Sequence, residues 1–454
     1  MHCDVHCSAQ TAYVQDFPLK TATCSLSSSS GSAVNGRSSP FEDSLVQYIK
    51  SYEYSKTFDW HRSRQTHEVS PSSSDLSYRA GVPRRPNPYK QFTSSPSSAR
   101  GGNTRCTLSK VLQHYDYSNA FGSLVPSIPG WHNVSGTAAP NTCSASPSSS
   151  NTLGHLRLKE LISSITPPSP HHTRRDDSSG DDNKKGEGRL ICQFSSIGSF
   201  SSKWIEEFTA SAHVPSIITK TNTRNNGERL SFIWPTVPEI KNLMLGYRGG
   251  GSVPGQMKNV DKEFLRPILC KWVNDRDILN KNNATPHMKT YLKIGGRNNG
   301  GGGATDGAPV EWCTIASQNM SVAAWGQLQI NKRTGDPKGT LFMRHWELGV
   351  FFSPCRLSKF LSDRGDGPDE VVKQSARVKM VPVPMLETGV CEGHVSEAGT
   401  DKTATIIVPL PLPFEIPPVN YAADEVPWAR DRDTEEPDGF GTVVRKGLLV
   451  SNFM

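Results

Sequence analysis

Apolar residues recur at helical spacing in three segments of the chain. The first, residues 41–52, has acidic Glu42 and Asp43 in its first turn, where the helix dipole favours negative charge. The second begins at Thr107, a residue typical of an N-cap, and the third covers residues 154–165. The inward positions expected in the third are Leu156, Leu158, Leu161 and Ile162. The pattern therefore predicts three helices.

Five further apolar runs, bounded by glycine, asparagine and proline, predict β-strands. They cover residues 189–198, 230–236, 288–295, 310–318 and 346–354. Helical patterns fall between some of them, at residues 201–213 and 262–279. Because strands and helices alternate, we expect a mixed α/β domain from about residue 107 to the C-terminus. Residues 406–420, "IIVPLPLPFEIPPVN", hold too many prolines for a central strand, so we expect an extended covering segment there.

Much of the remaining chain cannot build a core. Only 35% of the 454 residues are hydrophobic, and serine, proline and glycine are concentrated in a few stretches. We expect loops or disordered inserts at residues 25–40, 62–105, 136–152, 163–188 and 295–308.

Composition limits the class of protein without identifying it. No apolar run of membrane-spanning length occurs, and the N-terminus lacks the order of a secretory signal, so we expect a soluble, non-secreted protein without a membrane partner. The ten cysteines form no CxxC pair, which favours reduced thiols in the cytosol or nucleus. A net charge of +7 permits an anionic partner. His2, Cys3, His6 and Cys7 lie too close together for tetrahedral geometry, so we expect no metal.

The stretch "PHMKTYLKIGG" carries the first candidate chemistry, His287 and Lys289. On a strand, residues two apart point to the same face, so an imidazole and an ammonium could act on one small group. This pairing suits phosphoryl chemistry, because lysine neutralises phosphate oxygens and histidine attacks phosphorus or moves a proton. The spacing alone favours the alternative, a half-exposed strand edge with an incidental histidine.

Neighbouring segments strengthen the phosphoryl interpretation. Ser317 and Asn319 precede a helix-like "SVAAWG" that begins with Ser321, which places amide and hydroxyl donors near a helix start. Glu347 heads an apolar strand, where it could bond a histidine and fix its tautomer. "CQFSSIGSF" and "YRGGGSVPG" supply serines and glycines at apparent strand ends. Each feature alone has an ordinary alternative, a simple turn or a structural ion pair.

Together these blocks resemble the tyrosyl-DNA phosphodiesterases, a family of the phospholipase D superfamily. The similarity rests on "GHLRLKEL", "QFSSIGS", "YRGGGSVP", "PHMKTYLK", "SQNMSVAAWG", "WELGVFF" and "VPW". The resemblance implies a phospholipase D-like α-β-α sandwich of two similar halves, each giving one His-x-Lys pair and a later asparagine to a shared site. It also implies that one histidine is a nucleophile that forms a phosphohistidine, while the other is an acid and base.

The resemblance implies a role for each matching residue. His287 is the general acid/base, Lys289 and Asn319 stabilise charge on the phosphate, and Glu347 is a supporting acid. Ser196, Ser199 and Ser321 match family positions that contact the DNA backbone. Pro254 and Trp428 match the wall on the peptide side of the groove. No cofactor is implied.

The sequence departs from the family at the first His-x-Lys pair. Of the 13 histidines only His287 has a lysine two residues later, and the nearest imitation, His172-Thr173-Arg174, lies in a charged insert. We therefore expect residues 1–106 to be a remnant of the first half and residues 107–454 to be a complete second half. The opening segment looks like the part of the family that follows the first-half asparagine. On this interpretation the chain begins too late to carry a nucleophile.

The predicted function is a DNA-repair phosphodiesterase that hydrolyses 3′-phosphotyrosyl adducts derived from topoisomerase I. Expected partners are DNA with 3′ adducts, single-stranded or nicked, and the attached peptide, with the protein a nuclear monomer. One alternative is a catalytically incomplete DNA-binding remnant or short isoform. Another, a phospholipase-like enzyme that pairs one motif across a dimer, is disfavoured by the leftover first-half segment.

Overall fold

The computed structural model describes about three-fifths of the chain. The described residues are 17, 19, 39–65, 107–134, 152–165, 188–214, 229–272, 284–295, 309–331, 333–334, 337–364, 377–384, 405–414 and 416–451. The predicted inserts lie almost wholly outside these ranges, so their predicted disorder stays a prediction. The boundary expected at residue 106 also lies outside them.

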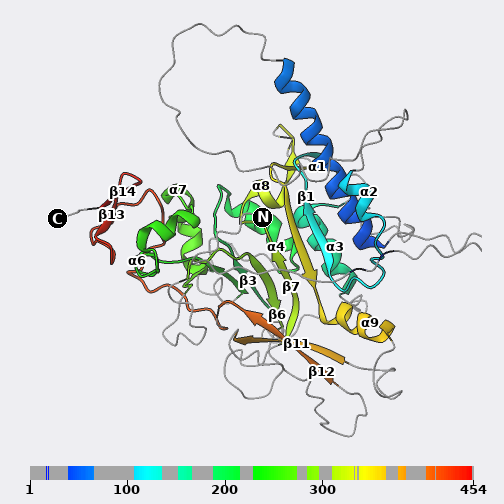
Figure 1. Cartoon of the computed structure of the whole chain (residues 1–454). Coiled ribbons are helices and arrows are strands. Elements are labelled where there is room, and N and C mark those ends of the chain that lie inside the picture. The colour runs from blue at the N-terminus through cyan, green and yellow to red at the C-terminus, as the bar shows by residue number, and fades with distance from the viewer. Residues whose placement is uncertain are drawn as a thin grey trace, which may run out of the picture.

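A mixed sheet of nine strands occupies the centre of the described structure (Figure 1). Its main path runs β1 (Ser123–Ser127), β10 (Glu347–Phe352), β7 (Val310–Ala316), β6 (Thr290–Ile294), β3 (Arg189–Gln193), β4 (Leu230–Ile233) and β5 (Leu269–Cys270). β3, β4 and β5 are parallel, whereas the other neighbours on this path are antiparallel. The mixed α/β class predicted from the alternation of patterns is confirmed.

Alternation along the strands builds a core on each face of the sheet. In β3, Leu190 and Cys192 belong to one apolar cluster, while Ile191 between them belongs to the other. The first cluster is completed by α3 (Gly154–Ile165) and α4 (Ser202–Ser211). The second is covered by α9 (Pro354–Arg364) and extends onto β11 (Arg377–Pro384) and β12 (Thr405–Leu412), which join the sheet through β7. Both faces are therefore covered, as a layered sandwich requires.

The N-terminal described helix packs on the β1 side of this sheet (Figure 1). α1 (Pro40–Gln65) starts where predicted and runs longer than residues 41–52. Phe41 stacks on Tyr117, with ring centroids 5.6 Å apart, and Tyr48 meets Trp346 edge-on at 5.7 Å. Thr107 is the N-cap of α2 (Leu108–Leu112), but its hydroxyl caps no helix N–H and contacts the hydroxyl of Ser109.

The prediction of a long helix at residues 262–279 is wrong for the residues of that range that the structure describes. Residues Glu263–Ile268 form the 3-10 helix η4, and Leu269–Cys270 form β5. Pro267 has no N–H to donate and disfavours a continuous α-helix, and β5 gains its hydrogen bonds from β4 instead. Residues 273–279 lie outside the described residues. The expectation for residues 406–420 holds, because proline-rich β12 pairs only with β11 among the described strands and is not central.

Two smaller sheets were not predicted. One joins β2 (Gly130–Asn133), β9 (Pro337–Met343) and β8 (Gln327–Ile330), and the other is the hairpin of β13 (Thr442–Arg445) and β14 (Leu448–Ser451). Short helices α6 (Val237–Lys241), η3 (Gly246–Ser252), α7 (Met257–Val260) and α8 (Val322–Trp325) complete the described elements. None of the helices in the described ranges has the length and apolar character needed to cross a membrane.

Candidate functional site

The strand directions bring the predicted site residues to one edge of the sheet. β6 runs antiparallel to both β3 and β7, so β3 and β7 end where β6 begins. β10 is also antiparallel to β7 and begins at that same edge. Ser196 and Asn319 therefore follow β3 and β7, while His287, Lys289 and Glu347 lie at or just before the start of β6 and β10. Residues far apart in the sequence converge for this reason.

The loops after β3 and β7 are joined by backbone contacts. Ile197 and Met320 form a parallel bridge, and the N–H of Gly198 donates to the carbonyl of Met320 at 2.9 Å. A Cβ added to Gly198 would lie 2.5 Å from the Cβ of Ser321, closer than any two carbons can pack. The glycine in "SSIGS" is therefore needed for this close approach of the two loops.

Replacing Gly198 with alanine is expected to lower the free energy of unfolding by roughly 1–3 kcal/mol, because the two loops must separate. Gly251 is the matched control, since nothing lies within 4 Å of a Cβ added there. Gly251→Ala should stay within about 0.5 kcal/mol of the unchanged protein. Denaturant unfolding measures both, and equal stabilities of the two variants would contradict the close approach.

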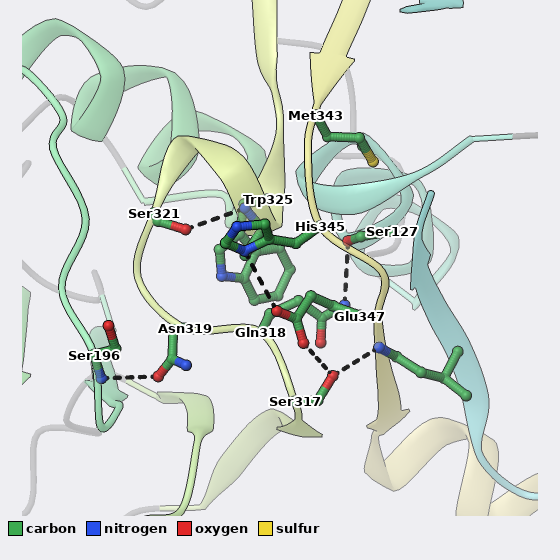
Figure 2. Close-up of polar contacts among 12 residues, drawn as sticks. Ser127, Ser196, Ser317, Gln318, Asn319, Ser321, Trp325, Met343, His345 and Glu347 are labelled. Carbon is green, nitrogen blue, oxygen red and sulfur yellow. Dashed lines mark hydrogen bonds and ion pairs between the residues drawn. The ribbon is translucent and has the colours of Figure 1, made fainter. Parts of the chain in front are cut away.

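Asn319 uses its carbonyl oxygen to hold the β3 loop (Figure 2). Oδ1 accepts from the backbone N–H of Ser195 at 3.1 Å and from that of Ser196 at 2.9 Å. Two backbone donors on one atom identify that atom as the oxygen, so the NH₂ group is on the opposite branch of the amide. The sequence suggested a carboxamide donor here, and this arrangement leaves that NH₂ group to act as one.

His287 and Lys289 lie just before a strand rather than on it. The strand predicted from residue 288 begins at Thr290, so the alternation argument for the direction of these two side chains does not apply. Proline at 286 supplies no N–H, and the N–H of His287 bonds back to the carbonyl of Thr285 at 2.8 Å. Nζ of Lys289 donates to the carbonyl of His287 at 3.1 Å, which ties the two residues together.

Lys289 is a buried cation, with only 9% of its surface exposed. Burial lowers the pKa of Lys289 from 10.5 to about 8, although the nearby charge of Glu347 raises it. An ammonium removed from water at a sheet edge gains most from an anion, so this position favours a ligand such as phosphate.

Glu347 is held by a serine from the end of β7 (Figure 2). The hydroxyl of Ser317 donates to Oε2 of Glu347 at 2.6 Å and accepts from the N–H of Leu348 at 2.9 Å. Burial raises the pKa of Glu347, while the Ser317 hydroxyl and the charge of Lys289 lower it. Nδ1 of His345 approaches Oε1 at 3.7 Å. A role of Glu347 in orienting His287 stays a prediction.

The three predicted serines differ in exposure. Ser196 is half-buried and Ser199 is exposed. Ser321 is 9% exposed and is the N-cap of α8, where its hydroxyl oxygen accepts from the N–H of Ala324 at 3.1 Å. That bond occupies the oxygen as an acceptor and leaves the O–H free to donate.

Trp428 lies in the core, with only 2% of its surface exposed. Nε1 donates to the carbonyls of Gly250 and Val253, at 3.3 and 3.1 Å, and the indole stacks on Tyr247 at 5.8 Å. Trp428 thus supports the "YRGGGS" turn from beneath, while Pro254 after that turn is exposed. A contact of either residue with a peptide stays a prediction.

Sequence reasoning missed the polar network beneath the β7 loop. The hydroxyl of Tyr291 donates to the carbonyl of Gln318 at 2.7 Å, and Nε1 of Trp325 donates to that hydroxyl at 3.2 Å. Nε2 of Gln318 bonds the carbonyl of Val125 at 2.7 Å. These three buried side chains fix Gln318, the residue directly before Asn319. From the sequence alone these residues are typical of a buried core. The position of Gln318 next to Asn319 was the feature that could have indicated the network.

No group of three or more histidine, cysteine or acidic side chains in the described ranges could hold a metal ion. The expectation that the reaction needs no metal or organic cofactor stays a prediction.

Comparison with known proteins gives consistent matches. The tyrosyl-DNA phosphodiesterase family profile matches residues 98–422. Tyrosyl-DNA phosphodiesterase 1 of Arabidopsis thaliana is 28% identical over 336 residues, which cover 73% of this chain and 46% of that protein. A probable tyrosyl-DNA phosphodiesterase of Caenorhabditis elegans is 24% identical over 341 residues, covering 74% and 55%. The chain thus spans about half the length of the curated relatives it matches.

Among solved structures, the chain is similar to a yeast tyrosyl-DNA phosphodiesterase. The TM-score is 0.45 at 16% identity, covering 87% of this chain and 66% of the yeast chain.

Proposed function

Because this chain belongs to the tyrosyl-DNA phosphodiesterase family, we propose that it supplies the acid/base half of a site that cleaves 3′-phosphotyrosyl bonds on DNA. The observation that carries the proposal is the buried ammonium of Lys289, tied to His287 at the sheet edge where Asn319 also lies. A cation in that position is stabilised by the phosphate of a phosphodiester. The substrate would be a 3′ end that carries a peptide left by topoisomerase I.

In the proposed reaction, Lys289 and the NH₂ group of Asn319 bind non-bridging phosphate oxygens. Both stabilise the negative charge that develops there in the transition state. A histidine from a second His-x-Lys pair attacks phosphorus, and His287 gives its proton to the leaving tyrosine oxygen as the P–O bond breaks. His287, now neutral, takes a proton from water, which attacks the phosphohistidine and releases a 3′-phosphate.

The second pair has to come from outside these 454 residues, because only His287 has a lysine two positions later. We therefore infer that these residues alone bind DNA without turning over. The same half-site is compatible with an active phosphodiesterase and with a DNA-binding remnant. Whether the second His-x-Lys pair is present determines which of the two activities is observed.

A chimera tests the proposal. The part of the Arabidopsis relative that precedes its aligned region is joined to the N-terminus of this chain, and cleavage of a 3′-phosphotyrosyl oligonucleotide is measured. We expect cleavage by this chimera, called here the complemented enzyme, and none by the 454 residues alone. Turnover by the chain alone would contradict the need for a second pair, and an inactive but folded and DNA-binding chimera would contradict the half-site.

Two substitutions of Asn319 separate its structural and binding roles. Asn319→Ala leaves the N–H groups of Ser195 and Ser196 without their acceptor and should cost about 1–3 kcal/mol of unfolding free energy. Asn319→Asp keeps the acceptor, so its stability should stay close to that of the unchanged chain. Its affinity for a 3′-phosphorylated oligonucleotide should nevertheless fall about tenfold or more, because a carboxylate replaces the NH₂ donor. Equal affinities of the Asp variant and the unchanged chain would contradict the phosphate contact.

Nuclear localisation and a monomeric state are also proposed, both from the DNA substrate and the family membership. Localisation of a fluorescently tagged chain and analytical ultracentrifugation test them.

A further inference from the structure

An aromatic pair stands on the outer face of the small sheet β2-β9-β8. Trp131 of β2 is 65% exposed, and its ring centroid lies 4.3 Å from that of Phe342 in β9, with the rings tilted by 30°. The strand register places Trp131 opposite Phe342, and Phe342 opposite Gln327 of β8. The guanidinium of Arg344 lies 5.5 Å from the centre of the Phe342 ring. A large open indole face thus lies beside a second ring and a cation.

The inner face of the same sheet accounts for its stability. Leu341 and Met343 are each 1% exposed and pack with Ile128, Leu153 and the partly buried Leu328. Because side chains alternate along a strand, Phe342 between Leu341 and Met343 faces outward, together with its register partners Trp131 and Gln327. The β8–β9 register shifts beyond Leu328, so Lys338 is assigned to this surface by its exposure. Apolar packing on the inner face therefore attaches the small sheet to the rest of the protein. An exposed tryptophan on the outer face is not needed for that packing.

The charged side chains of the three strands are basic, although the carboxylate of Glu207 in α4 accepts from the N–H of Leu328 in β8 at 2.7 Å. In the described parts of the sheet, residues 130–133, 327–330 and 337–343, no carboxylate occurs. Lys338 and Arg344 are exposed, and Gln327 and Gln329 add amide groups. Among the described residues between 327 and 345, the charged side chains are Arg333, Lys338 and Arg344, which are all basic and all exposed. Such a surface attracts a polyanion.

The sheet is continuous with the candidate site at both ends. Ser321 caps α8, and β8 follows α8 after Gly326. At the other side, the N–H groups of Arg344 and His345 donate to the carbonyl of Ala323 in α8, at 2.9 and 3.0 Å, and Glu347 follows. Figure 2 shows Ser321, Met343, His345 and Glu347 on the segments that connect the sheet with the Asn319 loop.

We propose that this outer face, the aromatic platform of Trp131, Phe342, Arg344, Lys338, Gln327 and Gln329, binds single-stranded nucleic acid that extends from the candidate site. A base stacks on the open face of Trp131, while Arg344 and Lys338 contact backbone phosphates. Exposed aromatics beside basic side chains are the combination that holds single strands without sequence preference. The assignment of DNA as the strand rests on the proposed function.

Equilibrium binding of the full chain to fluorescent oligothymidine of about 12 nucleotides tests the platform. Trp131→Ala should weaken binding about tenfold, because one stacked base is lost. The dependence of affinity on salt should stay unchanged in that variant, since no phosphate contact is removed. In Lys338→Gln the slope against log salt should instead fall by about one.

Two variants are controls. Phe440 is 60% exposed and lies before β13, so Phe440→Ala removes a comparably exposed ring from another surface and should bind as the unchanged chain does. Trp131→Phe keeps a ring for stacking and should recover most of the affinity. It also separates stacking from misfolding, provided that the thermal unfolding temperatures of both Trp131 variants match that of the unchanged chain.

The platform is overturned if the unchanged chain does not bind oligothymidine, if Trp131→Ala binds as tightly as Phe440→Ala, or if Trp131→Ala dissolves a dimer of the unchanged chain. Failure of the proposed function is a different result. A complemented enzyme that cleaves no phosphotyrosyl ester, while oligothymidine binding still depends on Trp131, leaves the platform standing. Normal cleavage with Trp131-independent binding removes the platform alone.

Discussion

Replacing His287 with alanine is expected to lower the rate of 3′-phosphotyrosyl cleavage by the complemented enzyme about 10²–10⁴-fold, the range that a positioned general acid and base contributes. Tyrosinate is a poor leaving group unless its oxygen is protonated as the bond to phosphorus breaks. In the proposed reaction the same histidine activates water for the second step, so both steps should slow. Single-turnover kinetics with a 3′-phosphotyrosyl oligonucleotide measure the effect.

The control for that result is Ser199, an exposed serine on the neighbouring loop. Ser199→Ala should retain the cleavage rate within about tenfold, because it removes at most one neutral hydrogen bond to the DNA backbone. A rate for His287→Ala that matches the rate for Ser199→Ala would contradict the acid/base role of His287.

Affinity for a 3′-phosphorylated oligonucleotide is expected to fall as pH rises through about 8, the pKa to which burial lowers Lys289. Below that pH the side chain is a protonated ammonium that attracts phosphate, and above it the side chain is a neutral amine. One linked proton limits the loss to about tenfold per pH unit. Fluorescence anisotropy from pH 6 to about pH 10 measures this alkaline limb.

Two substitutions of Lys289 test the assignment of that limb. Lys289→Arg keeps its charge throughout this range, so the limb should disappear. Lys289→Met removes the charge at every pH and should bind about 10²-fold more weakly at neutral pH, where a buried charge-assisted contact is lost. An alkaline limb that persists in the Arg variant would assign the titration to another group.

The sequence pattern predicted elements well where local signals agreed with the fold. In α3 the leucine spacing and the glycine at its start give the observed bounds, Gly154–Ile165. The prediction failed at residues 262–279, where apolar helical spacing competed with Pro267 and with the pairing of β5 to β4. That pairing is non-local, so no window of sequence around residue 269 contains it.

The small sheet β2-β9-β8 escaped prediction for a similar reason. Trp131 pairs with Phe342 although the two are far apart in the chain. The strands of this sheet also carry polar residues on their outer face. Lacking a continuous apolar run, these strands do not stand out as patterns. The platform that they form could be found only after the strand register was known.

The candidate site shows the same limit. The spacing of His287 and Lys289 alone favoured an incidental histidine; the segments with Asn319 and Glu347 strengthened the phosphoryl interpretation, and the resemblance assigned their roles. The structure adds the physical cause, since the directions of β3, β6, β7 and β10 place all of them at one edge. The burial of Trp428 beneath the "YRGGGS" turn was equally hidden, because it depends on a contact between distant segments.

The most direct test of the half-site is a change of leaving group in the complemented enzyme with His287→Ala. In a 3′-(p-nitrophenyl) phosphodiester the leaving group, p-nitrophenolate, departs without protonation. Formation of the phosphohistidine therefore no longer needs an acid, whereas hydrolysis of the phosphohistidine still needs a base. We expect a rapid burst of about one equivalent of nitrophenolate, followed by turnover about 10²-fold or more below that of the unsubstituted complemented enzyme. Loss of the burst in His287→Ala would make this histidine the nucleophile, and full turnover would remove it from the reaction; either result contradicts an acid/base role for His287.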